Sequence, residues 1–255
     1  MTHKPNPLPN STRRGLVASF ALLGASGALL STLPGCAATP APVDYAALLA
    51  SAQRPDADRN ADARRMPVDL LRLSLVRPGM SVLDISAGGG YTTQVMSVAV
   101  GGSGKVWAQT PKPGPVLVSR AKPPSNIEVL VRSFDDPFPA DAPRVDLVTL
   151  VLSYHDIVNT PIDRMNMNRA MFTALKPGGR LVIMDHSGRP GSGLTETNTF
   201  HRIEEAALRR EIEAAGFVFE ADSAAWRNPA DPRSMHYNEA KPSSDKFALR
   251  FMRPR

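Results

Sequence analysis

From residue 80 onward, short apolar runs rich in β-branched residues alternate with longer stretches in which apolar residues recur at helical spacing. The apolar runs predict strands at 80–85, 105–109, 127–131, 145–152, 180–185, 217–221 and 246–252. The longer stretches predict helices at 91–100, 161–175 and 198–215. Strands that alternate with helices favour a parallel sheet covered on both faces.

The last two predicted strands have no helix between them, and consecutive strands without a crossover helix are expected to be antiparallel. The pattern therefore predicts an α/β fold: a doubly wound, mostly parallel seven-stranded sheet with an antiparallel last strand. In such a sheet ligands bind beyond the carboxyl ends of the parallel strands, so the chemistry is expected in the loops that follow them.

The N-terminal part predicts an export segment. In residues 1–40, Arg13 and Arg14 precede an uncharged, mostly apolar run of signal-peptide type. "LPGC" resembles a lipoprotein box that ends at Cys36. We therefore expect an exported protein, either periplasmic or anchored to the cell envelope through a lipidated Cys36. Residues 41–66 are interpreted as a linker and a helical N-terminal cap, and residues 67–255 as the main domain.

Composition narrows the possible partners. With 42% hydrophobic and 21% charged residues, the chain is typical of a globular protein. Its formal net charge is +6, yet no Lys/Arg run with interleaved aromatic residues occurs, so a nucleic-acid partner is not expected. Cys36 is the only cysteine, which excludes an internal disulfide and a cluster of thiolate metal ligands.

The stretch "VLDISAGGGYTT", residues 82–93, places Asp84 at the end of a predicted strand and three glycines directly before a predicted helix. The glycines allow the backbone to approach a ligand, and the helix N-terminus offers free N–H groups. A dinucleotide fingerprint needs a third spaced glycine where Thr93 stands, which disfavours a nicotinamide-dependent oxidoreductase. Asp84 would repel a pyrophosphate but would attract an ammonium or sulfonium group.

These residues resemble the first motif of the class I S-adenosylmethionine (SAM)-dependent methyltransferases, with Asp84, Gly88 and Gly90 matching and Ser86 in place of the first glycine. "LKPGGRLVIMD", residues 175–185, is similar to that family's turn into its fifth strand. The likeness spans about residues 67–252. Shorter motifs, among them "YHD", "DHSG" and "RNPAD", resemble a bacterial group of exported methyltransferases. The resemblance implies a Rossmann-like fold, SAM as the cofactor and methyl transfer to a small-molecule acceptor.

The resemblance also implies which residues bind the cofactor. They are Asp84, Ser86, Gly88, Gly90, Thr110 and Asp135. The acid that binds the ribose in the family would stand at Gln109 or Thr110, where this chain has no carboxylate. Asp135 matches the acid on the adenine side; alternatively, it only solvates a turn.

The predicted catalytic residues follow the fourth and fifth strands. His155 titrates near neutral pH and could deprotonate an acceptor, Tyr154 could pack on the cofactor, and Asp156 could orient the imidazole. Asp185 and His186 repeat the pair after the next strand. Alternatively, Asp156 caps a helix and His155 is an ordinary residue of the rim. The two pairs could also bind a metal, but no dense histidine spacing supports this, and no metal is expected.

Two further segments are expected over the site. One is a flexible loop at 187–194, followed by His201, Arg202 and Glu204 in the first turns of the helix 198–215. The other is the long connection 223–245, a candidate lid or binding loop. It carries a mixed aromatic and polar set, namely Trp226, Arg227, Asn228, His236 and Tyr237.

A second functional hypothesis remains open. SAM is made in the cytoplasm, whereas the N-terminus predicts export. The protein could therefore be a non-catalytic ligand-binding or accessory exported lipoprotein on a degenerate methyltransferase fold. Ser86 and the missing acid at the end of the second strand would then be marks of drift.

Overall fold

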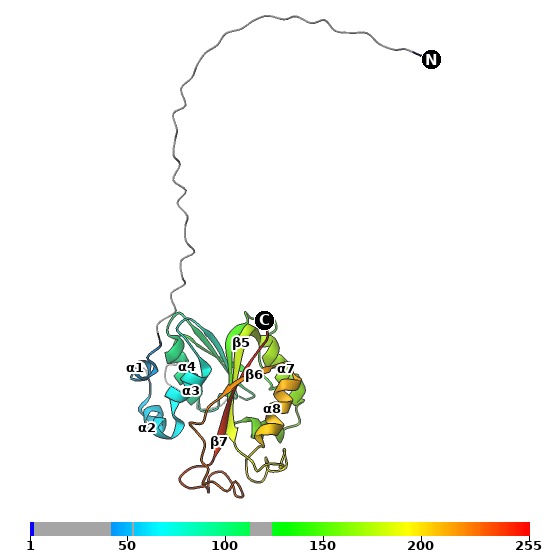
Figure 1. Ribbon diagram of the computed structural model, residues 1–255. Coiled ribbons are helices and arrows are strands. Elements are labelled where there is room, and N and C mark those ends of the chain that lie inside the picture. Colours follow the sequence, from blue (N-terminus) through cyan, green and yellow to red (C-terminus); the bar gives the residue numbers. More distant parts are fainter. Residues whose placement is uncertain (3–41, 53, 113–123) are drawn as a thin grey trace, which may run out of the picture. The chain divides into compact units, whose positions relative to one another are not determined.

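Seven strands form one sheet in the order β3-β2-β1-β4-β5-β7-β6 in the computed structural model, which describes residues 1–2, 42–52, 54–112 and 124–255 (Figure 1). The strands are β1 (Ser81–Ile85), β2 (Lys105–Thr110), β3 (Ile127–Val131), β4 (Val145–Val151), β5 (Leu175–His186), β6 (Val218–Asp222) and β7 (Lys246–Met252). β1 to β5 pair in parallel, and β7 runs antiparallel between β5 and β6. The predicted fold class is thus confirmed.

Helices cover both faces of this sheet (Figure 1). They are α1 (Tyr45–Leu49), α2 (Asp56–Arg65), α3 (Pro67–Ser74), α4 (Tyr91–Val100), α6 (Tyr154–Val158), α7 (Arg164–Ala174) and α8 (Glu205–Ala214). Residues of α1, α3 and α4 share one apolar core, and residues of α6, α7 and α8 share a second core on the opposite face. The seven helices found in the described residues all belong to the compact unit formed by Pro42–Arg255.

The strand sequences explain the two cores, because successive side chains of a strand point to opposite faces of the sheet. In β1, Val82 packs in the core that contains α3 and α4, whereas Leu83 and Ile85 pack in the core that contains α7 and α8. A strand buried on both faces needs such a continuous apolar run. The buried polar exception in β1 is Asp84, near the carboxyl end of the strand.

Three elements begin three or more residues away from their predicted starts. β5 begins at Leu175 rather than at residue 180, because Leu175 pairs with Val145 before the turn at 176–179 and the register then shifts. α7 begins at Arg164, where the Asp163 carboxylate accepts hydrogen bonds from the N–H groups of Met165 and Asn166. α8 begins only at Glu205, seven residues after the predicted start at residue 198.

The predictions about export lie outside the described residues. Residues 3–41 contain the apolar segment, the paired arginines and Cys36, so the signal peptide and the lipidated cysteine stay predictions. Among the described residues, no helix combines the length and the apolar character that crossing a membrane requires.

Candidate active site

The glycine turn after β1 is held against β2 by Gln109. The Ser86 N–H donates to Gln109 Oε1 and the Ala87 N–H to the Gln109 carbonyl, both at 2.9 Å. Ser86, Gly88 and Gly90 all have positive φ angles, of 55°, 50° and 77°. Glycine adopts this left-handed region freely, whereas an L-residue such as Ser86 is strained there by roughly 1–2 kcal/mol. Position 86 thus has a backbone conformation that glycine favours, although its residue is serine.

Asp84 lies buried beneath this turn, with 1% of its surface exposed. Its carboxylate accepts hydrogen bonds from Thr93 Oγ1 on α4 at 2.6 Å and from Thr149 Oγ1 on β4 at 2.7 Å. Burial raises the pKa of Asp84 to about 6, although the threonine hydrogen bonds act in the opposite direction. The carboxyl is therefore mostly ionised near pH 7, and it is held with little solvent around it.

The predicted ribose and adenine positions are occupied by groups that bond within the protein. Gln109 is buried, and its Nε2 donates to the Arg132 carbonyl at 2.6 Å. Thr110 Oγ1 donates to the Lys112 carbonyl at 2.8 Å. Asp135 accepts a hydrogen bond from Ser133 Oγ in a turn. Among the described residues that line the cavity, neither Thr110 nor Asp135 occurs.

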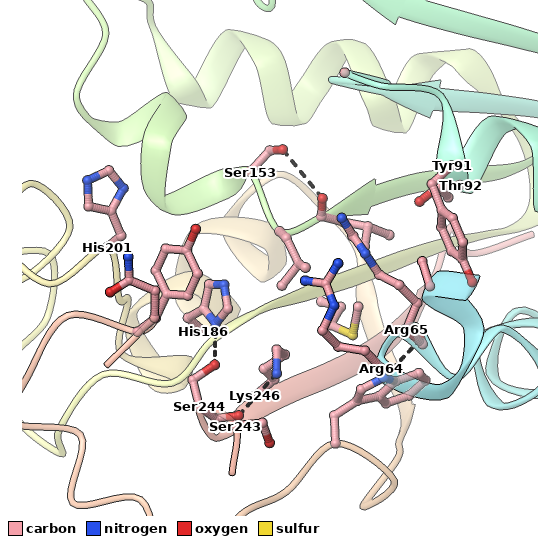
Figure 2. Close-up of a pocket in the computed structure, with 18 of the residues that line it drawn as sticks. Arg64, Arg65, Tyr91, Thr92, Ser153, His186, His201, Ser243, Ser244 and Lys246 are labelled. Carbon is pink, nitrogen blue, oxygen red and sulfur yellow. Dashed lines mark hydrogen bonds between the residues drawn. The ribbon is translucent and has the colours of Figure 1, made fainter. Parts of the chain in front are cut away.

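A cavity of about 790 Å³ joins the glycine turn to the ends of β4 and β5. Asp84, Ser86, Gly88 and Gly89 line what we call the glycine end. His155, Asp156, His186, His201 and Tyr237 line the opposite part, which we call the histidine end. Figure 2 shows Arg65 and Tyr91 on one side of this cavity and His186 and His201 on the other. The volume suits a ligand of cofactor size together with a small second molecule.

His155 is the most constrained side chain of the histidine end, with 2% of its surface exposed. Its Nδ1 lies 2.5 Å from Asp185 Oδ1, and its backbone N–H donates to Asp185 Oδ2 at 2.9 Å. Its Nε2 lies 3.3 Å from Asp156 Oδ1. Burial lowers the pKa of His155, but the hydrogen bonds and charges of Asp156 and Asp185 outweigh that effect and raise it to about 9. The ring is thus fixed between two carboxylates.

His186 is held differently, although it directly follows Asp185 at the end of β5. Its Nδ1 lies 2.8 Å from Ser244 Oγ, and its ring stacks on Tyr237 with 4.0 Å between the centroids. Burial, followed by the charges of His155, Lys246 and nearby arginines, lowers the pKa of His186 to about 2. His186 is therefore a neutral imidazole at ordinary pH, beside a charged His155.

Tyr154 does not pack on the cavity as expected. Its ring is fully buried in the core formed with α7 and α8, and its hydroxyl donates to Glu211 Oε2 at 2.6 Å. Tyr154 and His155 are consecutive residues at the start of α6, so their side chains point in different directions. Tyr154 enters the core, and His155 lines the cavity. Asp185 is likewise fully buried beneath His155, and it is not one of the described residues that line the cavity.

The segment before α8 is irregular, contrary to the helix expected from residue 198. His201 has a φ of 49°, and Ile203 forms a β-bridge to Ser187. Arg202 is fully buried and donates to both oxygens of Asp231 and to the Ser187 carbonyl. Glu204 accepts hydrogen bonds from the N–H groups of Gly191 and Gly193, so the loop at 187–194 is tied to this segment.

The connection 223–245 contributes to the site through some of its predicted residues. Trp226 and Tyr237 line the cavity. Arg227 instead pairs with Glu205, while the Asn228 N–H donates to Asp245. The His236 ring lies 4.8 Å from the His201 ring, centroid to centroid. The loop is thus packed over the site and anchored to the sheet.

A group of cationic side chains that the sequence did not predict also lines the cavity. Arg64 and Arg65 at the end of α2 and Lys246 at the start of β7 line it, together with Tyr91. The Tyr91 hydroxyl donates to Asp62 Oδ1 at 2.7 Å, and the Arg65 guanidinium lies 5.3 Å from the centroid of the Tyr91 ring. The paired arginines at the end of a polar helix were the available signal in the sequence.

Comparison with known proteins gives matches to methyltransferases. A model of the protein-L-isoaspartate(D-aspartate) O-methyltransferase family matches residues 45–118. The ubiquinone/menaquinone biosynthesis C-methyltransferase UbiE of Ectopseudomonas mendocina is 27% identical over 172 residues, which are 65% of this chain and 62% of that protein. The UbiE of Shewanella oneidensis is 29% identical over 123 residues, 46% of this chain and 47% of that protein. The chain thus spans less than two thirds of the length of these relatives.

Solved structures share the fold. A SAM-dependent methyltransferase from Aquifex aeolicus matches 83% of this chain and 99% of its own, with a TM-score of 0.55 and 18% identity. The N-methyltransferase NodS from Bradyrhizobium japonicum matches 78% of this chain and 99% of its own, with a TM-score of 0.57 and 18% identity. The chain therefore shares the fold of these methyltransferases.

Proposed function

We propose that the protein is a SAM-dependent methyltransferase that acts on a small-molecule acceptor. One observation carries the proposal: a single cavity of about 790 Å³ is lined by the glycine turn at one end and by histidines and a carboxylate at the other. A methyltransferase needs such an arrangement, because donor and acceptor must meet in line within one enclosure.

The charges of the glycine end suit the amino-acid part of SAM, which carries a carboxylate, an ammonium and a sulfonium. Arg64 and Arg65 line the cavity and would pair with the carboxylate, and the buried Asp84 would favour the cationic groups. The turn at Ser86 and Gly88 lets the backbone approach the ligand. The ribose would rest on neutral groups, since β2 ends in Gln109 and Thr110.

When bound, SAM supplies an electrophilic methyl group. The histidine end would hold the acceptor, with its nucleophilic atom directed toward the glycine end. The long connection between β6 and β7 would help to exclude water, because it contributes Trp226 and Tyr237 to the lining of the cavity. Of the predicted catalytic residues, His155, Asp156 and His186 can contact an acceptor there, whereas Tyr154 supports them from the core through α6.

The site of action belongs to the same proposal. We place the protein in the cell envelope, either in the periplasm or attached through a lipidated Cys36, on the strength of the apolar segment in residues 1–40. Mass spectrometry of the protein from a membrane fraction would show a diacylglycerol adduct on Cys36 if it is attached, and an N-terminus after residue 36 without lipid if it is not.

Calorimetric titration of SAM into the full-length chain tests the enzymatic proposal, with NADH as the control ligand. We expect saturable binding in the micromolar range that S-adenosylhomocysteine displaces, and no heat with NADH. Asp84→Asn should weaken SAM binding at least about tenfold, because it removes the buried negative charge beside the ligand.

Asp69→Asn is the matched control. Asp69 pairs on the surface of α3 with Arg72, so its replacement should leave SAM affinity unchanged. Equal affinity in wild type and Asp84→Asn would remove Asp84 from the ligand site. A well-folded chain that binds neither SAM nor S-adenosylhomocysteine would contradict the proposal and favour the non-catalytic lipoprotein.

A further inference from the structure

We propose that His155, Asp156 and His201 bind a divalent transition-metal ion of the zinc type at the histidine end of the cavity. All three residues line the cavity, and each presents one ligand atom such that these atoms lie within 4.8 Å of one another. His155 and Asp156 come from α6, whereas His201 comes from the irregular segment before α8. The site therefore exists only in the folded chain.

The distances fit an ion placed between the three groups. Asp156 Oδ1 lies 3.3 Å from His155 Nε2 and 2.9 Å from His201 Nδ1. A tetrahedral ion with bonds of about 2.1 Å holds its ligand atoms roughly 3.4 Å apart. Adjustments of a few tenths of an ångström at Asp156, together with an inward shift of His201 of up to roughly 1.4 Å from the 4.8 Å limit, would complete the geometry. Asp156 and His201 are free to make them, because their side chains are 55% and 38% exposed.

The second observation is the group behind His155. The Asp185 carboxylate, fully buried, contacts His155 Nδ1 at 2.5 Å and leaves Nε2 directed at Asp156. Metal-binding histidines almost always give their other ring N–H to a carboxylate or carbonyl in this way, which fixes the tautomer and makes the ligand nitrogen more basic. The Asp185 carboxylate is held in turn by the N–H groups of His155 and His186.

The donor atoms select the class of metal. Two imidazoles and one carboxylate suit zinc, iron, cobalt or nickel, whereas magnesium and calcium prefer oxygen ligands throughout. Three protein ligands leave a coordination position open, as in catalytic rather than structural zinc sites. Because the three residues line the cavity, that position faces the space proposed for the acceptor. A role in polarising an acceptor oxygen rests on the proposed function, but the metal site itself does not.

The test is a Zn²⁺ titration of the full-length chain after chelator treatment, monitored by competition with a chromophoric chelator. We expect one tight site per chain and no competition from Mg²⁺. Asp156→Asn and His201→Gln should each weaken Zn²⁺ binding by about 100-fold or more. Asp185→Asn, which leaves all three ligands in place, should weaken it by about 10–100-fold.

His236→Gln is the matched control, because His236 lies beside His201 but outside the proposed ligand set. It should retain wild-type affinity. Absence of saturable Zn²⁺ binding, or binding that survives both Asp156→Asn and His201→Gln, would overturn the proposal. So would an equal loss in His236→Gln, since it would assign the ion to other ligands. Circular dichroism of each variant shows that lost affinity does not reflect unfolding.

SAM calorimetry on the same samples separates the two proposals. Zn²⁺ binding without SAM binding would leave the metal site and remove the methyltransferase. SAM binding without Zn²⁺ binding would support the methyltransferase and remove the metal site.

Discussion

Asp84 is the most buried of the carboxylates that line the cavity. The fold holds it with two threonine hydroxyls rather than with a cation. Burial favours the neutral form of a carboxyl, so the pKa of Asp84 is about 6 in place of 3.8. A positively charged ligand would offset that cost, which gives the residue a natural place in binding SAM.

The raised pKa predicts a pH dependence of stability. Because the folded chain binds the Asp84 proton more tightly than the unfolded chain does, this residue favours folding at low pH. That contribution is lost as the pH rises from about 4 to about 6. A shift of two units corresponds to about 3 kcal/mol in the free energy of unfolding.

Urea unfolding of wild type and Asp84→Asn between pH 4 and pH 7 measures this effect. The variant should gain stability relative to wild type over that interval, since it has no charge to bury. Other titrating groups are common to both chains and cancel in the difference. Parallel pH profiles would show that Asp84 titrates alike in the folded and unfolded chain.

At the scale of elements, the turn between α4 and β2 shows how closely the helices pack on the sheet. A Cβ at Gly104 would lie 2.4 Å from Val100 Cβ and 2.6 Å from the Met80 carbonyl oxygen. A Cβ at Gly102, two residues earlier, would have no neighbour within 4 Å. The two glycines are close together in the chain, but only Gly104 has no free space for a Cβ atom.

We therefore expect Gly104→Ala to lower the free energy of unfolding by about 1–3 kcal/mol or more, because backbone atoms must move to relieve the overlap. Gly102→Ala should be neutral or slightly stabilising, since alanine restricts the unfolded chain. Chemical denaturation of both variants measures the difference. A loss at Gly102 as large as that at Gly104 would contradict the steric explanation.

The elements also show what the sequence could predict. The strands were predictable because each is an apolar run bounded by turn residues, and the glycine turn was found from its spacing after Asp84. The start of α8 was not predictable. The residues from 198 to 204 are compatible with a helix, but the bridge from Ile203 to Ser187 and the pairing of Arg202 with Asp231 hold them in another conformation.

Within the site, two placements could not be predicted from the sequence either. Asp156 and His201 are 45 residues apart, so no spacing rule could pair them. Tyr154 was predicted to line the cavity because it adjoins His155, yet the short helix α6 directs its side chain into the core toward Glu211. Contacts between distant segments decide both cases.

At the scale of the whole molecule, a buried ion pair connects the segment before α8 with the loop over the cavity. Arg202 and Asp231 have fully buried side chains, and Asp231 also accepts hydrogen bonds from the N–H groups of Arg233 and Asp245. Removing one member of such a pair leaves an uncompensated buried charge. The cost falls on the global stability, which is only about 5–15 kcal/mol for a folded domain.

Arg202→Leu should therefore lower the free energy of unfolding by about 3–5 kcal/mol. Arg72→Leu is its control, because the Asp69–Arg72 pair is exposed on α3 and should be worth less than about 1 kcal/mol. Thermal and chemical unfolding of both variants provide the comparison. Similar small losses in both would mean that the loop is not anchored through Arg202.

The two ends of the cavity come from different parts of the chain. Residues 58–92 supply the glycine end and the arginines beside it, whereas the histidine end is built from residues 155–201 and from Tyr237 in the connection before β7. Mutations in the second part can therefore change what enters the histidine end without disturbing the first. Homologues that share the glycine turn can diverge in the molecules they modify. Trp226 donates to the Arg65 carbonyl and so supports the donor side. Exchange of residues 227–245 between such homologues, with Trp226 kept, offers a route to engineering new acceptor selectivity.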